Sequence, residues 1–240
     1  MSPKISIITP VYDNGKEYTG LKWLDILNIC LNNQIEQDFE WLIMYDGKSE
    51  ECEEQVKKYN KARYFESEKR QGNWGNFSRD FCSRQALGEY LVFIDQDNII
   101  FKDYLSKLSS LLDTNNEIGI ALCPIYLSKS CAIKIVLPDI MTRSINTLMF
   151  MVRKSIFAVD FWWARLRGSG DEFTILKRLI TNGIKDSKTG EEPLGIWNGA
   201  RYKYSKIIYP DFIDYSVIQK IAGNQDSDTR KDKDLWFYLK

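Results

Sequence analysis

Apolar residues recur along the first hundred positions in two alternating patterns. Four short runs, rich in β-branched and aromatic residues, predict strands at residues 5–11, 39–45, 62–66 and 90–94. Apolar or helix-favouring residues predict helices between these runs, at residues 21–31, 50–59 and 77–87. This alternation predicts an α/β, Rossmann-like fold, with a mostly parallel sheet flanked by helices.

The second half of the chain is less regular. Helical spacing predicts helices at residues 105–112 and 173–180, and apolar runs predict strands at residues 118–122, 133–137 and 147–152. Residues 188–190 have the composition of a turn between polar strands. Because there is no internal repeat and no clean linker, we expect a single domain over residues 1–225, with a regular half at 1–100 and an irregular half at 101–225.

The last fifteen residues, 226–240, form a charged stretch followed by an apolar end, Leu235 to Leu239. We expect a solvated tail whose apolar end docks on the body of the protein, on a partner or on a membrane surface. The sequence leaves these three alternatives open.

Polar residues follow three of the predicted strands at the point where each strand ends. Tyr12 follows the first, Asp46 the second, and Asp95 with Asp97 the fourth. The carboxyl ends of parallel strands meet at one edge of a sheet, where α/β proteins bind ligands. We therefore expect these side chains to converge.

The Asp95-Gln96-Asp97 triplet carries most of the chemical information. Residues i and i+2 of an extended segment point the same way, so both carboxylates can face one ligand. Hard oxygen donors suit Mg²⁺ or Mn²⁺, which bind through one or two carboxylates and substrate phosphates. The alternative is an ordinary solvated acidic loop.

Other residues near the strand ends could complete a nucleotide site. The Asp46 carboxylate can accept a hydrogen bond from a base N–H, and the backbone of residues 9–12 can flank a planar base. Arg79, on the helix before the fourth strand, could reach a phosphate. The structural alternatives are an Asx-turn for Asp46 and a surface ion pair for Arg79.

The composition narrows the function classes. There are 33 basic and 33 acidic side chains, a formal net charge of +0, so the basic surplus of a nucleic-acid binder is missing. The chain has 0 histidines, which excludes Ser–His–Asp and Cys–His catalysis and any metal site that requires imidazole.

The cysteines and the apolar segments indicate the cellular setting. None of the 5 cysteines forms a CxxC pair, so we expect reduced, mostly buried thiols. The N-terminus lacks the long apolar region of a signal peptide, and no stretch is apolar enough to span a bilayer. These features predict a soluble, cytoplasmic protein, with the tail as a peripheral contact to the inner membrane face if it docks there.

Four passages between residues 4 and 100 follow the order and spacing of a known family. Residues 5–12 (ISIITPVY) resemble the opening strand of the family 2 glycosyltransferases, of the GT-A fold. Residues 46–49 (DGKS) are similar to the second half of their DDGS motif. Residues 79–90 resemble the ARN…A.GEY passage that leads into their LDADD motif, which reads IDQDN here at residues 94–98.

The resemblance implies a role for each matching residue of the nucleotide half, 1–100. Pro10, Tyr12 and Asp46 would hold the nucleoside, which the family suggests is uridine, and Arg79 would contact the phosphates.

The resemblance also implies a divalent metal cofactor, Mn²⁺ or Mg²⁺. Asp97 would ligate the ion, and Asp95 would approach the ribose or a metal-bound water.

In the acceptor half, 101–225, residues 147–180 are similar to the later segment of the family, which ends in an ED pair. The pair reads Asp171-Glu172 here, so either Glu172 or Asp171 would be the base that takes a proton from the acceptor hydroxyl. Trp162 and Trp163 could stack on an acceptor sugar or belong to the core.

The chain departs from the family pattern at several positions. Tyr45 replaces the first Asp of DDGS, and Asn98 the last Asp of LDADD. Residues 72–75 (GNWG) do not align with the NxG of the family, so we assign them no role. The metal-binding histidine of some relatives cannot exist here.

Taken with the resemblance, the residues indicate a hexosyltransferase-like enzyme. It would move a sugar from a nucleotide-diphosphate sugar, UDP-linked, to a hydroxyl of a glycan or lipid-linked acceptor, with inversion. One alternative is a non-catalytic sugar-nucleotide or glycan-binding domain. A nucleotidyltransferase is less favoured, because the chain has no glycine-rich phosphate loop.

Overall fold

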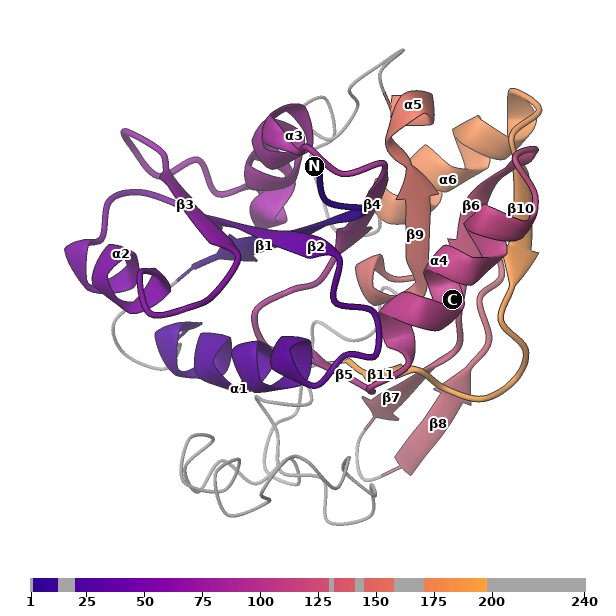
Figure 1. The fold of residues 1–240 in the computed structure, drawn as a ribbon, viewed down its shortest axis with the longest axis horizontal. Helices are drawn as coiled ribbons and strands as arrows, with labels where there is room; N and C mark the ends of the chain where they lie inside the picture. The colour runs from indigo at the N-terminus through magenta and orange to yellow at the C-terminus, as the bar shows by residue number, and fades with distance from the viewer. Residues whose placement is uncertain (1, 13–19, 130–131, 141–144, 158–170, 198–240) are drawn as a thin grey trace.

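The computed structural model describes residues 2–12, 20–129, 132–140, 145–157 and 171–197. In this part of the chain, a seven-stranded sheet has the order β10-β6-β9-β4-β1-β2-β3 (Figure 1). Its strands are β1 (Ile5–Val11), β2 (Phe39–Tyr45), β3 (Ala62–Glu66), β4 (Tyr90–Phe93), β6 (Ile118–Leu122), β9 (Phe150–Arg153) and β10 (Lys185–Lys188). The helical elements are α1 (Gly20–Asn32), α2 (Glu50–Val56), η1 (Asn73–Gly75), α3 (Asn76–Gln85), α4 (Tyr104–Thr114), η2 (Thr147–Met149), α5 (Lys154–Phe157) and α6 (Asp171–Thr181).

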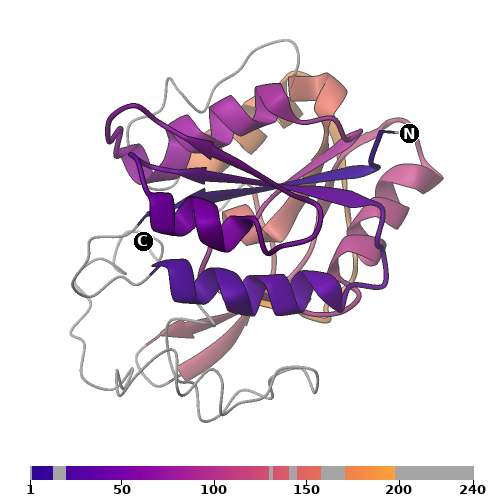
Figure 2. The same cartoon turned by 60° about the vertical axis from the view of Figure 1, so that its left-hand side comes forward.

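The first four strands are parallel, which confirms the expected α/β sheet. β1 pairs with β2 on one side and with β4 on the other, and β2 pairs with β3. Successive strands therefore move outward from β1 to β3 and then return to β4. Because such crossovers are right-handed, α1 and α2 cover one face and α3 the other (Figure 2). The reversal beside β1 creates a switch point, where α/β sheets bind ligands.

The second half of the chain extends the same sheet with one antiparallel strand. β9 lies between β4 and β6 and is antiparallel to both. The strand expected at 147–152 is therefore wrong in its first half, where η2 forms instead. The reason is local: the Asn146 side chain accepts a hydrogen bond from Leu148 N at 3.0 Å and caps the turn.

A second sheet lies below the first in Figure 1. The sequence pattern predicts one of its strands, expected at 133–137 and observed at Ala132–Val136, but not the others. The order of this sheet is β5-β11-β7-β8. The strands are β5 (Ile99–Ile100), β7 (Ile125–Lys129), β8 (Ala132–Val136) and β11 (Gly195–Ile196). The turn expected at 188–190 follows polar β10, but the next strand, β11, is buried and not polar.

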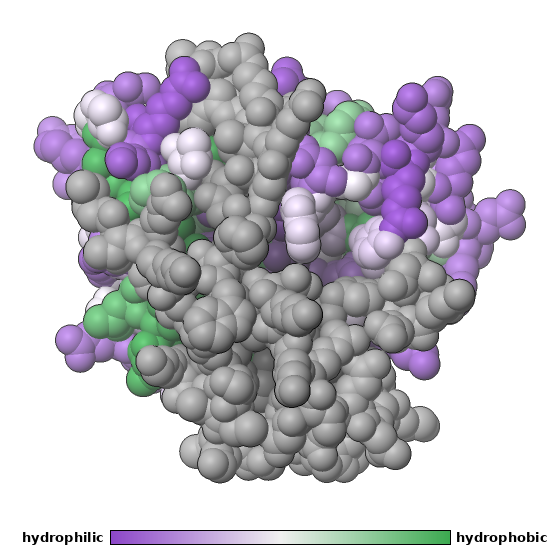
Figure 3. Space-filling model, turned by 180° about the vertical axis from the view of Figure 1, so that it is seen from behind, coloured by the Kyte–Doolittle hydropathy of each residue, from purple (hydrophilic) through white to green (hydrophobic). Residues whose placement is uncertain are grey.

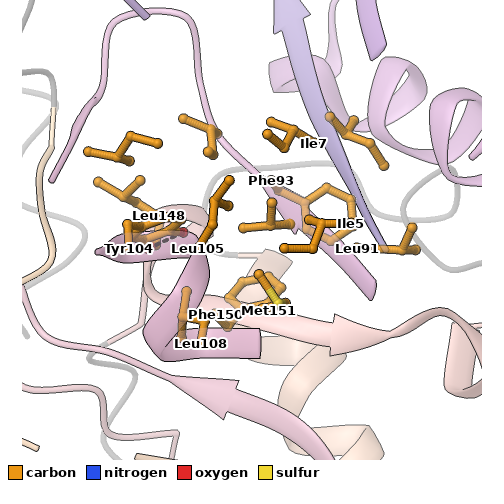
Figure 4. Close-up of a cluster of buried hydrophobic side chains, with 14 of the residues drawn as sticks. Ile5, Ile7, Leu91, Phe93, Tyr104, Leu105, Leu108, Leu148, Phe150 and Met151 are labelled. Carbon is orange, nitrogen blue, oxygen red and sulfur yellow. Dashed lines mark hydrogen bonds between the residues drawn. The ribbon is translucent and has the colours of Figure 1, made fainter. Parts of the chain in front are cut away.

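The hydrophobic core lies where the two halves meet. Side chains of β1, β4, α4, η2 and β9 converge there (Figure 4). Phe93 and Phe150 have ring centroids 5.8 Å apart, and the Tyr104 hydroxyl donates a 2.9 Å hydrogen bond to Leu148 O. The two halves therefore share one core.

Buried polar residues join β1, β2 and the turn before β4. Glu40 accepts hydrogen bonds from Ser6 Oγ at 2.7 Å and Leu87 N at 2.5 Å, and it pairs with Arg63 at 2.7 Å. Gly88 N donates to Ser6 Oγ at 2.8 Å, and a Cβ at Gly88 would lie 2.6 Å from Ser6 N. These contacts fix the path of the chain from α3 into β4.

The expectation of buried thiols is confirmed for the described cysteines: Cys30, Cys52, Cys82 and Cys123 are buried. Burial raises the pKa of the Cys30 and Cys82 thiols to about 12. Cys131 lies outside the described residues. On the face seen in Figure 3, the described residues are mainly hydrophilic, with smaller hydrophobic areas. Within the described ranges, no helix combines the length and the apolar character that crossing a membrane requires.

Candidate active site

The polar residues predicted at the strand ends lie along one edge of the sheet. Val11 pairs with Tyr45 in the β1–β2 register, and Asp46 N donates a 2.9 Å hydrogen bond to Val11 O. On the other side of β1, Ile94 N donates to Ile8 O at 3.0 Å. The residues that follow β1, β2 and β4 therefore leave the sheet at the same, carboxyl edge.

Asp46 holds a neighbouring loop against this edge. Its Oδ1 accepts a hydrogen bond from Gln71 N at 2.6 Å, and its Oδ2 accepts one from Gly72 N at 2.8 Å. An ionised carboxylate has about four acceptor positions, so these two bonds leave capacity for a further N–H. Asp46 thus fixes the connection between β3 and α3, which is more than the local Asx-turn considered from the sequence.

The loop at residues 72–75 has an unusual backbone. All four residues have positive φ: 64° at Gly72, 57° at Asn73, 54° at Trp74 and 78° at Gly75. A Cβ at Gly75 would lie 2.8 Å from Pro10 Cβ, so glycine allows the loop to pack on the end of β1. Trp74 is 70% exposed. Residues 72–75, to which the family resemblance assigns no role, therefore adjoin the site.

Arg79 connects this loop to the acidic triplet. Its guanidinium forms an ion pair with Asp95 Oδ1 and donates to Trp74 O at 2.7 Å and Asn76 Oδ1 at 3.3 Å. The Arg79 side chain is only 5% exposed. The surface ion pair considered as the alternative for Arg79 is therefore wrong, because the pair is largely buried.

Asp95 is held from the second half of the chain as well. Thr147 Oγ1 donates to Asp95 Oδ2 at 3.2 Å, and Thr147 is 1% exposed. The carboxylate thus has one oxygen on Arg79 of α3 and the other on Thr147 of η2. Thr147 was not among the expected site residues, because only the fold brings it beside Asp95.

The acidic triplet forms a turn and not the extended segment assumed from its spacing. Asn98 N donates to Asp95 O at 3.0 Å, which closes the turn. The Gln96 amide accepts from Tyr12 N at 3.1 Å and donates to Tyr12 O at 2.9 Å. Gln96 thereby joins the triplet to the end of β1, and Asp97 is 8% exposed beside it.

The Tyr12 ring carries a cation. The Arg70 guanidinium carbon lies 3.9 Å from the centroid of this ring, within the range of a cation–π interaction. Arg70 precedes the two backbone amides that Asp46 binds. Tyr12, Asp46 and the acidic triplet are therefore linked through one loop.

The carboxylates of the site could supply only some of the ligands of a hard divalent ion. Within the described ranges, no group of three or more His, Cys, Asp or Glu side chains could hold a metal alone. Mg²⁺ and Mn²⁺ often bind through one or two carboxylates, with substrate phosphates and waters as the other ligands. Asp97, and Asp95 with its oxygens on Arg79 and Thr147, are the carboxylates of the triplet that could contribute to such a site.

The expected residues of the acceptor half are less fully described. Asp171 is the first residue of α6, and Glu172 is half-buried in its first turn. Trp162, Trp163 and the tail at 226–240 lie outside the described residues.

The strand order, the reversal beside β1 and the polar carboxyl edge define a GT-A type of α/β fold. The model of Glycosyl transferase family 2 matches residues 6–167, more than half of the chain, and the chain belongs to this family. Both expectations, the fold and the family, are thereby confirmed.

Curated relatives match about half of this chain. An uncharacterized glycosyltransferase of Mycoplasma genitalium is 31% identical over 136 residues, which cover 54% of this chain and 43% of the relative. The poly(ribitol-phosphate) beta-N-acetylglucosaminyltransferase TarS of Staphylococcus aureus is 27% identical over 121 residues, 48% of this chain and 20% of TarS. The chain thus spans less than half the length of these relatives.

Solved structures share the fold. S. aureus TarS 1–349 in complex with UDP has a TM-score of 0.63 at 18% identity, over 91% of this chain and 69% of that one. The mannosyltransferase PcManGT from Pyrobaculum calidifontis, in complex with GDP-Man and Mn²⁺, has a TM-score of 0.58 at 12% identity, over 82% and 57%.

Proposed function

We propose that this chain transfers a sugar from a nucleotide-diphosphate sugar to an acceptor hydroxyl. The observation that carries the proposal is the Asp95–Gln96–Asp97 turn, bound to Tyr12 by Gln96 and to Arg79 by Asp95 at the carboxyl edge of the sheet. Membership of glycosyl transferase family 2 supports the same reaction. A UDP-linked donor is favoured, because TarS has been solved with UDP and with UDP-GlcNAc.

In this proposal, the end of β1 and Asp46 bind the nucleoside. Pro10 and Tyr12 flank the base, and Asp46 accepts its N–H while keeping its bonds to Gln71 and Gly72. Asp95, oriented by Arg79 and Thr147, faces the ribose or a metal-bound water. Arg79 contributes to the phosphate environment from its buried position.

Asp97, with Asp95, would hold Mn²⁺ or Mg²⁺. When bound, such an ion offsets the negative charge that develops on the departing diphosphate. The mannosyltransferase structure with GDP-Man and Mn²⁺ supports a divalent cofactor in a protein of this fold.

On the acceptor side, Glu172 or Asp171 would take the proton from the attacking hydroxyl oxygen. A positioned carboxylate base contributes about 10²–10⁴-fold to the rate of such a step. Trp162 and Trp163 would stack on a glycan or lipid-linked acceptor, and the family resemblance implies inversion at the anomeric carbon.

We also propose that residues 1–225 form one domain, in a cytoplasmic protein. The Asp95–Thr147 hydrogen bond and the position of β9 between β4 and β6 support a common body for both halves. Contact of the 226–240 tail with a membrane remains part of this proposal.

The experiment is a panel of UDP- and GDP-sugars incubated with the full chain and Mn²⁺ or Mg²⁺. We expect slow release of free nucleoside diphosphate from one donor. The Asp97→Asn variant should no longer release it. Asp186→Asn, a matched change at an exposed position of β10, should leave the release unchanged. Pyrophosphate as product would indicate a nucleotidyltransferase, and no turnover of any donor would favour a binding domain.

A further inference from the structure

Arg70 is an exposed cation with no carboxylate partner among the described residues. Its guanidinium instead makes a cation–π interaction with Tyr12, 3.9 Å from the ring centroid. Arginine more often pairs with a carboxylate or a phosphate, because its planar guanidinium can donate two parallel hydrogen bonds. The charge of Arg70 is thus available to a ligand at this edge.

The surrounding contacts connect Arg70 to the acidic triplet through Tyr12. The next two residues, Gln71 and Gly72, are bound to Asp46 through their backbone amides. The Tyr12 backbone is bound in turn by Gln96, the central residue of the triplet. The guanidinium therefore rests on a ring that is fixed to the proposed metal-binding turn.

Arg79 is less suited than Arg70 to offset the negative charge of a ligand. Its guanidinium is buried and already paired with Asp95, so much of its charge is compensated within the protein. Arg70 is exposed and has no such ion pair within the part of the chain that the structure describes. A donor diphosphate carries several negative charges, and a metal ion held by few protein ligands would offset only some of them.

The distance between Arg70 and Tyr12 also indicates which part of a nucleotide Arg70 would meet. A planar base inserted between the two groups would need about 7 Å, since stacked carbon atoms are separated by about 3.5 Å on each side. The 3.9 Å observed leaves no such space. The guanidinium of the exposed Arg70 can instead donate its N–H groups to a ligand that does not stack on the Tyr12 ring.

We propose that Arg70, held on the Tyr12 ring, is a binding residue for the diphosphate of the nucleotide donor. This assignment rests on the proposed function and adds a cation that the sequence comparison does not supply.

The test is calorimetric titration of the full chain with UDP and GDP, each compared with its nucleoside, uridine or guanosine, in the presence of Mn²⁺. We expect Arg70→Gln to weaken binding of the diphosphate about tenfold, as for the loss of one charge-assisted contact, and to leave nucleoside binding within about twofold. Arg70→Lys should lose less, because it keeps the charge without the planar donor pair.

Lys69→Gln is the matched control, since it removes the adjacent exposed cation. An equal loss in Lys69→Gln and Arg70→Gln would overturn the assignment, as would an equal loss for nucleoside and diphosphate. Unchanged diphosphate affinity in Arg70→Gln would also overturn it while leaving the proposed function intact. A wild-type chain that binds neither UDP nor GDP would overturn the proposed function, and the assignment with it.

Discussion

At the scale of single residues, Asp95 is the best-supported member of the site. Arg79 and Thr147 each bind one of its carboxylate oxygens, from elements that lie far apart in the sequence. A carboxylate held on both sides has a fixed orientation, which is what precise placement of a ribose or a metal-bound water requires. In the proposed site, Asp97 would then be the residue of the pair that binds the ion directly.

Removal of the Thr147 hydroxyl should loosen Asp95 without changing the core. Thr147→Val keeps the shape of this buried side chain but not the 3.2 Å hydrogen bond. We expect the rate of nucleoside diphosphate release to fall about tenfold, since a hydrogen bond to a charged group is lost. Thr147→Ser keeps the hydroxyl and should recover most of the rate. Equal activity in Thr147→Val and the wild type would contradict a positioning role.

Replacement of Arg79 should affect stability as well as function. Arg79→Gln leaves the partly buried Asp95 carboxylate without its charged partner. Breaking a fully buried ion pair costs about 3–5 kcal/mol. Because Asp95 is partly exposed, we expect the free energy of unfolding to fall by about 2–3 kcal/mol. Urea unfolding measures this loss. A loss below about 0.5 kcal/mol, as for exposed pairs, would contradict the account.

The site residues that could be read from the sequence are those that act through strand-end position. Asp46, Asp95 and Asp97 follow apolar runs, so their common edge could be predicted. Gln96 and Thr147 could not, because their contacts depend on how the end of β1 and the turn at η2 approach the triplet. For Arg70, too, only the folded loop shows which ring it meets.

At the scale of elements, the first half of the chain follows its sequence pattern closely. β1, β2 and β3 have the bounds that the apolar runs predict, because each run contains β-branched or aromatic residues and is bounded by polar or turn residues. β5 and β11 have only two residues each, too few to show any periodicity. Of the second sheet, the hydrophobic pattern could therefore predict β8 but not the short strands β5 and β11.

The loop at residues 72–75 offers a test at this scale. Gly75→Ala combines positive φ with a Cβ that would lie 2.8 Å from Pro10 Cβ. Gly183→Ala is a control at which φ is +88° but no atom lies within 4 Å of the added Cβ. We expect each change to cost about 1 kcal/mol of backbone strain, and Gly75→Ala a further 1–3 kcal/mol from overpacking.

Urea unfolding measures the loss of stability in Gly75→Ala and in Gly183→Ala. Nucleoside diphosphate binding should weaken only in Gly75→Ala, because only that loop borders the edge with Pro10 and Asp46. Equal effects of both substitutions on stability and binding would contradict the close packing of the loop.

At the scale of the whole molecule, ion pairs join the amino end of β1 to α4. Asp113 accepts hydrogen bonds from Lys4 Nζ and from the Tyr90 hydroxyl, both at 2.8 Å. Burial alone would raise the pKa of Asp113, but the hydrogen bonds from Lys4 and Tyr90 outweigh it and hold the pKa below its usual value. This carboxylate therefore stabilises the fold when it is ionised.

Because the pKa of Asp113 is lowered in the folded protein, the stability of the fold depends on pH. The contribution of Asp113 is present above the unfolded pKa of about 3.9 and is lost as the pH falls through the lower folded value. We expect Asp113→Asn to cost about 0.5–1 kcal/mol at pH 7, because the pair is partly exposed. The difference in the free energy of unfolding between this variant and the wild type, measured by urea unfolding, should shrink toward pH 2. A difference that stays constant from pH 7 to pH 2 would contradict this origin.

The two halves of the molecule meet in one core, and the site lies at their junction. β9 separates β4 from β6, and η2, just before it, supplies Thr147 to Asp95. Asp95 of the first half and Thr147 of the second half are thus positioned by the same packing. The acceptor side could be predicted only from family resemblance, because its expected aromatic residues and base follow no regular pattern.

The most direct test of the donor site is calorimetric titration of UDP and GDP with and without Mn²⁺, in the wild type and in Asp97→Asn. We expect Mn²⁺ to raise the affinity of the wild type for one of these nucleotides at least about tenfold, as for an ion shared by carboxylate and phosphates, and to have little effect in the variant. Nucleotide binding that responds equally to Mn²⁺ in both proteins would contradict it.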